Sequence, residues 1–253
     1  MSLITYTEFR DKVVFITGVA SGIGQEQALA FLEQGAYVFG FDKQHTVEEL
    51  SEEFGTQFRF FYGDVTKAED LEKAVTQCLN DYHHIDILLN TAGKLDGFKD
   101  MMDTSEELWD MIYETNVKSY FRLTKLVLPI MLEKKQGTII NMASIAGLIG
   151  GGGGISYTMS KHAIVGFTKQ LALDYADKGI HVVGIAPGAI ETPMNAADFA
   201  GDGEMAKWVA KETPCKRWAS PKEVAQLTLY LSSQASSYIQ GSIVPIDGGW
   251  MTK

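Results

Sequence analysis

Short apolar runs, rich in β-branched and aromatic residues, alternate with longer amphipathic stretches from one end of the chain to the other. Near-continuous apolar runs bounded by turn residues are typical of parallel strands that are buried on both faces of a sheet. The runs predict strands at residues 13–17, 36–41, 58–62, 85–90, 138–142, 180–185 and 242–246.

The alternation of strands with helices indicates an α/β protein with a Rossmann-like, doubly wound parallel sheet of about seven strands. No repeat, low-complexity tract or linker divides the chain, apart from a glycine run at residues 150–154. We therefore expect residues 1–253 to form a single domain.

Three helical stretches matter for the later argument. Residues 23–34 follow the first strand, and residues 105–134 begin with Ser105 and two glutamates, which fit an N-terminal cap with acids in the first turn. Residues 155–178 carry small and apolar residues at helical spacing. That face either packs on the sheet or meets another subunit, so we expect a homo-oligomer, a dimer or a tetramer.

Composition and charge exclude several classes of function. The mean hydropathy is −0.03, and the net charge of −10 argues against nucleic acid or an anionic membrane as the main partner. No apolar run approaches the roughly 20 residues that span a bilayer. Residues 1–8 lack the basic and apolar segments of a signal peptide. Cys78 and Cys215 suit reduced thiols in a cytoplasmic protein, and the scattered histidines predict no metal site.

A glycine-rich turn, residues 17–24 with the sequence Thr-Gly-Val-Ala-Ser-Gly-Ile-Gly, joins the first predicted strand to its helix. In an open parallel sheet a pyrophosphate binds at this turn, because glycines let the backbone approach and the helix N-terminus offers free N–H groups. The spacing is Gly-x-x-x-Gly-x-Gly rather than the commoner Gly-x-Gly-x-x-Gly, and a plain tight turn is the alternative. The residues expected to hold a dinucleotide here are Gly18, Ser21, Gly22, Ile23 and Gly24.

Asp42 ends the second predicted strand, 18 residues after Gly24 (42 − 24). A carboxylate at this position can accept hydrogen bonds from the adenosine ribose hydroxyls and would repel a 2′-phosphate. Lys43 is adjacent and weakens the argument, and a turn aspartate is the alternative. The pattern favours NAD(H) over NADP(H) as the cofactor.

Two further loops follow successive strands at the same edge of the sheet. Asp64 and Val65 come after the third strand, where a carboxylate can accept from the adenine amino group. Asn90, Ala92 and Gly93 come after the fourth, where small residues let a cofactor lie against the backbone. Ordinary turn chemistry is the alternative for both loops.

Tyr157 and Lys161 are four residues apart in a predicted helix, thirteen residues after Ser144 (157 − 144). Side chains at i and i+4 share a helix face, so the phenol and the ammonium can address one point. A free phenol, with a pKa of about 10, is a poor base at neutral pH, and a nearby cation favours its phenolate form. The pair can serve as a proton-transfer device, or it can be a coincidence of two common helix residues.

Taken together, these motifs resemble those of the short-chain dehydrogenase/reductase family, including its 3-oxoacyl-carrier-protein reductase-like members. The family's Asn-Asn-Ala-Gly appears here with threonine as its second residue. The match runs from about Lys12 to Gly249, and its carriers are Thr17-Gly18-x-x-x-Gly22-Ile23-Gly24, Asp64, Asn90-x-Ala92-Gly93, Asn116, Ser144, Tyr157-x-x-x-Lys161 and Pro187-Gly188.

The resemblance implies reversible hydride transfer between a nicotinamide and a carbonyl or secondary alcohol. It implies that Tyr157 is the acid/base, and that Lys161 lowers the pKa of Tyr157 and holds the nicotinamide ribose. It implies that Ser144 hydrogen-bonds the substrate oxygen and that Asn116 anchors a water leading from Lys161 to solvent. A strand-end serine and a helix-kink asparagine are the alternatives.

The segment after the sixth strand completes the expected cofactor site. It contains Pro187 and Gly188, and the resemblance implies that the Ile190 backbone and the Thr192 hydroxyl fix the nicotinamide carboxamide. Residues 193–211 hold the position of the family's substrate lid, and their apolar side chains either close over a substrate or pack on the domain. The glycines at 150–154 remove side chains from one wall of the pocket, which leaves room for a bulky substrate or for loop motion.

Three functions remain open from the sequence. The first is an NAD(H)-dependent oxidoreductase acting on a secondary alcohol or ketone of the polyol, sugar-acid or hydroxy-acid class. The second is a 3-oxoacyl-carrier-protein reductase using NADP(H), with Lys134, Lys135 and Lys178 available to an acidic carrier. The third is a catalytically silent NAD(H)-binding sensor or scaffold, which the complete acid/base set disfavours.

Overall fold

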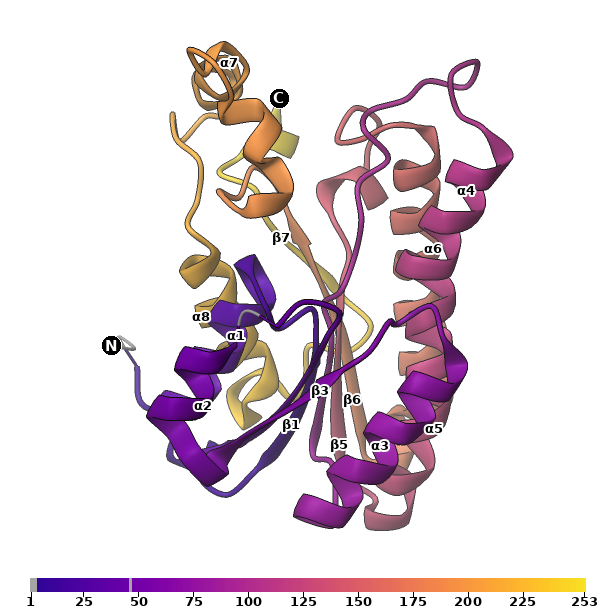
Figure 1. Cartoon of the computed structure of the whole chain (residues 1–253), viewed down its shortest axis with the longest axis vertical. Helices are drawn as coiled ribbons and strands as arrows, with labels where there is room; N and C mark the ends of the chain where they lie inside the picture. Colours follow the sequence, from indigo (N-terminus) through magenta and orange to yellow (C-terminus); the bar gives the residue numbers. More distant parts are fainter. Residues whose placement is uncertain (1–3, 46) are drawn as a thin grey trace.

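Seven parallel strands form one sheet in residues 4–45 and 47–253, the part of the chain that the computed structural model describes. The predicted absence of a signal peptide rests partly on residues 1–3, which lie outside that part. The sheet order is β3-β2-β1-β4-β5-β6-β7 (Figure 1), so the predicted α/β doubly wound fold is confirmed. The strand bounds are β1 Val13–Thr17, β2 Tyr37–Asp42, β3 Phe58–Tyr62, β4 Ile87–Asn90, β5 Gly137–Met142, β6 Ile180–Pro187 and β7 Ile243–Ile246.

Helices cover both faces of the sheet. Helices α1, α2 and α8 lie on one face and α3, α4, α5 and α6 on the other, while α7 stands beyond the carboxyl ends of the strands (Figure 1). The helix bounds are α1 Gly22–Glu33, α2 Glu48–Phe54, α3 Ala68–Tyr82, α4 Glu106–Tyr113, α5 Ser119–Lys134, α6 Ile155–Tyr175, α7 Glu204–Glu212 and α8 Pro221–Ser232. Within the described ranges, no helix has both the length and the apolar character that are needed to cross a bilayer.

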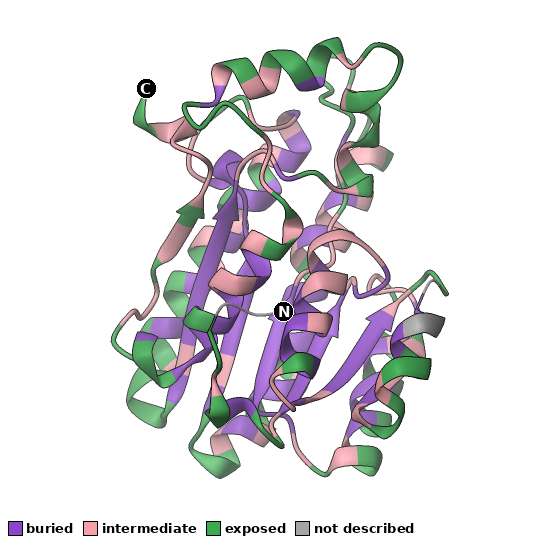
Figure 2. Cartoon of the chain, turned by 90° about the vertical axis from the view of Figure 1, so that its left-hand side faces the viewer, coloured by how far each residue is buried: buried purple, intermediate pink, exposed green. Residues whose placement is uncertain are grey.

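The central strands are largely apolar because both of their faces are covered. Every residue of β1 is buried, and the strands form the buried layer between the more exposed outer helix surfaces (Figure 2). Phe15 of β1 stacks on Phe39 of β2 with the ring centroids 5.2 Å apart, and both side chains belong to the core between the sheet and α3, α5 and α6. Burial of this kind is the main stabilising contribution to the fold.

The helix expected over residues 105–134 is interrupted. A π-helical segment, Glu114–Lys118, separates α4 from α5, with buried Asn116 inside it. Such segments occur often at functional sites because the widened turn redirects side chains. The helix expected over 155–178 also ends earlier, since residues 176–178 form a 3₁₀ turn.

The strand order reverses between β1 and β4, which are neighbours in the sheet although β2 and β3 follow β1 in the chain. In doubly wound folds, ligands bind outside the carboxyl ends of the strands at such a switch point. The segment that begins with the 3₁₀ turn Pro193–Phe199 and continues into α7 lies at the same end of the molecule (Figure 1).

Candidate active site

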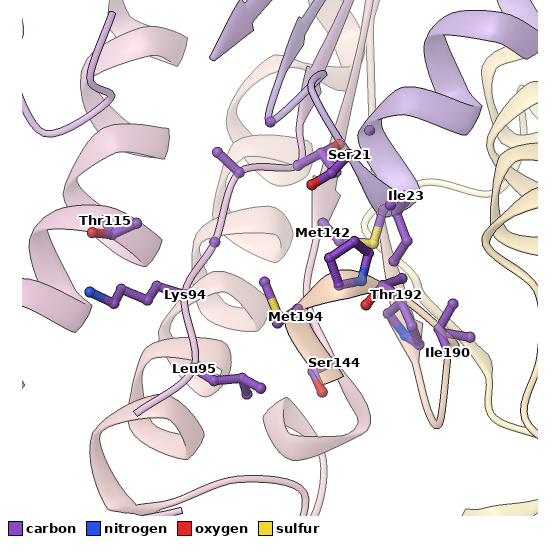
Figure 3. Close-up of a pocket in the computed structure, with 18 of the residues that line it drawn as sticks. Ser21, Ile23, Lys94, Leu95, Thr115, Met142, Ser144, Ile190, Thr192 and Met194 are labelled. Carbon is purple, nitrogen blue, oxygen red and sulfur yellow. The ribbon is translucent and has the colours of Figure 1, made fainter. Parts of the chain in front are cut away.

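A cavity of about 400 Å³ opens at the carboxyl ends of the strands and runs across the switch point. Loops after six successive strands of the sequence, β1 to β6, contribute to its wall. Figure 3 labels lining residues from the segments after β1, β4, β5 and β6. Most of the residues predicted from the sequence line it, and these are Gly18, Ser21, Gly22, Ile23, Gly24, Asp42, Asp64, Val65, Ala92, Gly93, Ser144, Tyr157, Lys161, Pro187, Gly188, Ile190 and Thr192.

The turn after β1 is shaped for close approach to a ligand. Gly18 has φ of +78°, and a Cβ built on it would lie 3.0 Å from the Cα of Ala92. Ser21 precedes α1 without capping it through its side chain. The helix start thus offers N–H groups that its preceding side chain does not cap, at a glycine-rich turn that lines the cavity, which is the arrangement that suits a pyrophosphate.

Two carboxylates occupy the end of the cavity next to β2 and β3. Asp42 Oδ2 accepts from the Ala20 N–H at 3.0 Å, and Oδ1 accepts from the Gln44 N–H at 3.0 Å, so this side chain is held by backbone on both sides. Asp64 Oδ1 accepts from both the N–H and the hydroxyl of Thr66 at 2.9 Å. Partial burial raises the pKa of Asp64, but these hydrogen bonds and nearby lysines outweigh it and hold that pKa below its usual value.

Ser144, Tyr157 and Lys161 meet at the other end of the cavity. Ser144 follows β5, where its Oγ accepts from the Ala146 N–H at 3.1 Å, and Tyr157 and Lys161 project from the first turns of α6. Lys161 Nζ lies 5.5 Å from the centroid of the Tyr157 ring and donates to the Met142 carbonyl at 2.8 Å. All three side chains are more than nine-tenths buried.

Burial dominates the electrostatics of this cluster. It raises the pKa of Tyr157 to about 12, against a lowering hydrogen bond from the Ser144 side chain and with a smaller raising effect of Asp96. Burial likewise lowers the pKa of Lys161 to about 7. Lys161 is not among the causes that set the pKa of Tyr157 here, so the expectation that Lys161 lowers the pKa of the phenol stays a prediction.

Comparisons with known proteins agree with this geometry. A family model described as enoyl-(acyl carrier protein) reductase matches residues 18–251. The 3-oxoacyl-[acyl-carrier-protein] reductase of Thermotoga maritima is 36% identical over 248 residues, covering 94% of this chain and 97% of that protein. The NAD-dependent glycerol dehydrogenase of Listeria innocua is 36% identical over 244 residues, covering 96% and 95%. The crystal structure of levodione reductase matches with a TM-score of 0.91 at 30% identity, covering 96% of this chain and 99% of that one.

The chain belongs to the short-chain dehydrogenase/reductase family. Members of this family bind a nicotinamide cofactor and transfer hydride to or from CH–OH and keto groups. The glycine-lined turn after β1 and the two carboxylates at β2 and β3 fit the phosphate and adenosine parts of such a cofactor.

Two of the predicted site residues do not line the cavity. Asn90 is 1% exposed, and its Nδ2 donates to Asn141 Oδ1 at 2.9 Å and to Thr124 Oγ1 at 3.2 Å, so its side chain joins β4 to β5 and α5. The side chain of Asn90 therefore does not face the cavity, and the expectation that a cofactor lies against the backbone of this loop stays a prediction. A polar group at a strand end faces either the cavity or the neighbouring strand, and the residue pattern does not distinguish the two.

Asn116, the other predicted residue outside the lining, is held by a loop and a helix. Its Oδ1 accepts from the Lys94 N–H at 2.8 Å, and its Nδ2 donates to the Lys94 carbonyl at 3.0 Å and to Ser160 Oγ at 3.1 Å. The amide thus fixes the loop after β4 against α6, beside Lys161. Sequence reasoning missed Ser160, although its position directly before Lys161 in the Tyr-x-x-x-Lys motif is a usable signal.

The expected lid contributes only its first part to the cavity. Met194 lines the pocket, whereas Phe199 packs on Trp218 with the centroids 4.9 Å apart, and Trp208 contacts Trp250 at 6.4 Å. Trp208 of α7 is still 53% exposed, so the choice between a closing lid and packing on the domain stays a prediction. Figure 3 shows Met194 and Leu95 near Ser144, and of these two residues sequence reasoning missed Leu95.

The glycine run lies only partly at the cavity wall. A Cβ on Gly150 or Gly151 would meet nothing within 4 Å, but one on Gly153 would collide with the Tyr157 ring, and one on Gly154 would lie 2.5 Å from Asp96 Oδ2. Of the five glycines, only Gly152 lines the cavity. The later glycines allow close packing around Tyr157 instead of enlarging the pocket.

Proposed function

We propose that this protein is an NAD(H)-dependent oxidoreductase that interconverts a secondary alcohol and a ketone. The observation that carries the proposal is one continuous cavity with two distinct ends. Ser144, Tyr157 and Lys161 meet at one end, and the backbone-held carboxylate of Asp42 lies at the other. A nicotinamide dinucleotide supplies the hydride, and the chain supplies the proton and the orientation.

Tyr157 is the group that exchanges a proton with the substrate oxygen. Because its pKa is raised, the phenol is protonated at neutral pH and can give its proton to a nascent alkoxide during ketone reduction. Ser144 can donate to the same oxygen and stabilise the charge that develops there. Lys161, which is buried beside the phenol, would hold the nicotinamide ribose, and Asn116 keeps the loop beside it in place.

The cofactor preference rests on Asp42. Its two oxygens are fixed by the N–H groups of Ala20 and Gln44, so the carboxylate cannot swing away from a ligand without breaking both bonds. A 2′-phosphate at this position would meet a fixed negative charge, whereas ribose hydroxyls would find an acceptor. The name of the Listeria innocua relative, an NAD-dependent dehydrogenase, supports the same choice.

The wall around the proton-transfer end supports an uncharged substrate. Leu95, Phe98 and Met194 contribute apolar side chains there. Lys94 also lines the cavity, but its Nζ lies 3.0 Å from Met111 Sδ and points toward Thr115, away from Ser144 (Figure 3). Of the substrate classes that the sequence left open, a polyol or a neutral ketone fits this wall better than a sugar acid or hydroxy acid, because Lys161, the lysine at this end, already donates to the Met142 carbonyl.

A 3-oxoacyl-carrier-protein reductase using NADP(H) is the second candidate, because the Thermotoga maritima relative bears that activity in its name. The lysines that the sequence offers for docking a carrier protein do not support this second candidate. Lys134 pairs with Asp86, and Lys178 lies beyond the far end of α6. From Tyr157 to Lys178 the 21 residues (178 − 157) span about 30 Å along a helix, so these lysines stand at the opposite end of the sheet from the cavity.

Activity on a panel of alcohols and ketones, followed at 340 nm with NAD(H) and NADP(H), tests the proposal. We expect turnover of neutral secondary alcohols or ketones with NAD(H). Asp42→Ala should relax discrimination against NADP(H), with Lys67→Ala as a control at an exposed lysine of the same edge. A parent enzyme that prefers NADPH would contradict the cofactor assignment, and binding of NAD(H) without turnover of any compound would favour the sensor or scaffold role.

We also propose that the chain forms a dimer or tetramer. Phe121 of α5 and Leu173 of α6 expose 53% and 77% of their surface on the outer face of the helix layer, and Met159 exposes 42%. Contact with a second copy would remove these side chains from water. Light scattering should give at least twice the monomer mass, and a monomer would contradict this expectation.

A further inference from the structure

The first turn of α6, which carries Tyr157, takes its cap from a distant part of the chain. The residue before α6 is Gly154, which has no side chain to bind the free N–H groups of a helix start. Asp96, in the loop after β4, fills that role. Its Oδ2 accepts from the Tyr157 N–H at 2.8 Å and from Ser156 Oγ at 3.0 Å, and its Oδ1 accepts from the Gly154 N–H at 2.9 Å.

Asp96 is a fully engaged buried carboxylate. The residue is 3% exposed, and its Oδ1 also accepts from the Phe98 N–H at 3.1 Å. All four partners are donors, so both oxygens act as acceptors, which is the hydrogen-bonding capacity of an ionised carboxylate. An amide in its place would turn an NH₂ group toward at least one of these donors.

The backbone around the cap is packed to admit this carboxylate. The Ile155 N–H donates to the Lys99 carbonyl at 3.0 Å, so the same loop satisfies another N–H of the first turn. A Cβ on Gly154 would lie 2.5 Å from both Asp96 Oδ2 and the Lys99 carbonyl oxygen. The glycine is thus required for the loop after β4 to reach the helix that carries Tyr157.

The charge of Asp96 also acts on the phenol. Among the described residues, the ionisable neighbours of Tyr157 are Lys161 on α6, whose Nζ is 5.5 Å from the ring centroid, Asp96 in the loop, and the buried phenol of Tyr120 on α5. Burial is the largest cause of the raised pKa of Tyr157, and the Asp96 charge adds to it, while the Ser144 side chain opposes both. A negative charge near a phenol disfavours the phenolate.

We propose that Asp96 is a positioning residue for proton transfer, which fixes the helix turn that carries Tyr157 and places near the phenol a negative charge that disfavours the phenolate. The proposal rests on the proposed function of Tyr157. It assigns to one remote carboxylate both the orientation of the acid/base and a bias against its phenolate form.

The pH dependence of turnover separates these roles from a merely structural one. Alcohol oxidation requires the phenolate, so kcat/KM rises with pH through the apparent pKa of Tyr157. Asp96→Asn removes the negative charge, and we expect this limb to move to lower pH by about one unit, with a loss of about 10- to 100-fold in kcat/KM at its plateau. Ser156→Ala keeps the negative charge of Asp96 and removes one hydrogen bond to that carboxylate. The pH at which kcat/KM rises should therefore be the same in Ser156→Ala as in the parent. A limb that does not move in Asp96→Asn would overturn the electrostatic role.

Hydrogen exchange tests the positioning role without any substrate. The Gly154 and Tyr157 amides should exchange at least tenfold faster in Asp96→Asn than in the parent, whereas the β4 amides should be unchanged. If the Gly154 and Tyr157 amides exchange at the same rates in Asp96→Asn as in the parent, the proposal is overturned. If Asp96→Asn does not fold, Asp96→Glu, which keeps the charge but is too long for the site, must show the same loss of protection with an unmoved pH limb. If the parent protein shows no turnover, the proposed function is refuted. Hydrogen exchange then still tests whether Asp96 fixes the first turn of α6.

Discussion

Replacing Lys161 with methionine should stabilise the fold while it abolishes catalysis. Lys161 is 3% exposed, and burial lowers the pKa of its ammonium from 10.5 to about 7. At about 1.4 kcal/mol per pH unit, that fall corresponds to roughly 4 to 5 kcal/mol of unfavourable free energy for the charged form in the folded chain. Loss of the hydrogen bond to the Met142 carbonyl offsets about 1 to 2 kcal/mol of the gain. The expected net increase in the free energy of unfolding at pH 7 is therefore about 2 to 3 kcal/mol.

The sign of the effect fixes its pH dependence. A lysine whose pKa is lower in the folded than in the unfolded chain destabilises the fold fully below the folded value of about 7, and this cost disappears as the pH rises toward 10.5. The advantage of Lys161→Met over the parent should thus be largest at pH 6 to 7 and should vanish near pH 10. Between about pH 7 and pH 10, the parent should gain stability with rising pH relative to the variant.

Urea unfolding without cofactor, at a fixed protein concentration and several pH values, measures this difference. At pH 7 the variant should melt roughly 5 to 10 °C higher in a parallel thermal scan. Lys169→Met is the control, because Lys169 is exposed on the same helix and its replacement removes a charge without changing a buried one. The reasoning would be refuted if Lys161→Met were less stable than the parent at pH 7, or if the difference between their free energies of unfolding did not change with pH.

Three further substitutions test the site and the core. Tyr157→Phe should reduce kcat by about 10² to 10⁴ while NAD(H) binding, measured by calorimetry, persists; turnover within about tenfold of the parent would contradict the acid/base role. Gly154→Ala should cost about 1 to 3 kcal/mol in urea unfolding because its Cβ would meet Asp96 and Lys99, whereas Gly150→Ala, with open space around it, should stay within about 0.5 kcal/mol. Phe15→Ala should cost about 3 to 5 kcal/mol, and a cost below about 1 kcal/mol would contradict its place in the core.

The cofactor end of the cavity was predictable because it obeys local rules. Buried parallel strands are recognised in a sequence as apolar runs, and the carboxyl ends of neighbouring strands meet at one edge of the sheet. Gly18, Asp42 and Asp64 each follow such a run directly, so their positions in the chain place them at that edge. The structure brings all three to the cavity.

The direction of a side chain at that edge was not predictable in the same way. Asn90 ends β4 just as Asp42 ends β2, yet its amide turns toward Asn141 and Thr124 in the sheet interior. The difference depends on which acceptors the neighbouring strand and helix offer. Asn116 shows the same effect, since the loop at Lys94 captures its side chain.

Asp96 escaped sequence reasoning for a stronger reason. Helix caps are recognised from residues next to the helix, because the capping side chain normally comes from the position just before it. Here the cap is 58 residues from Gly154 and 61 from Tyr157 along the chain. The glycine before α6 signals only that a local cap is missing, and the identity of the substitute depends on the tertiary fold.

These contrasts separate the cofactor half of the site from its substrate half. The cofactor half lies on strand ends and a helix start, whose places follow from the periodicity of the sequence. The proposed substrate half is built from irregular segments, with Leu95 after β4, Gly152 before α6 and Met194 after β6. The long-range hydrogen bonds of Asp96 join the first two of these segments. Changes at Leu95 or Met194 should therefore alter the choice of substrate while the affinity for NAD(H) stays within a few-fold of the parent, because these side chains support no part of the turn after β1.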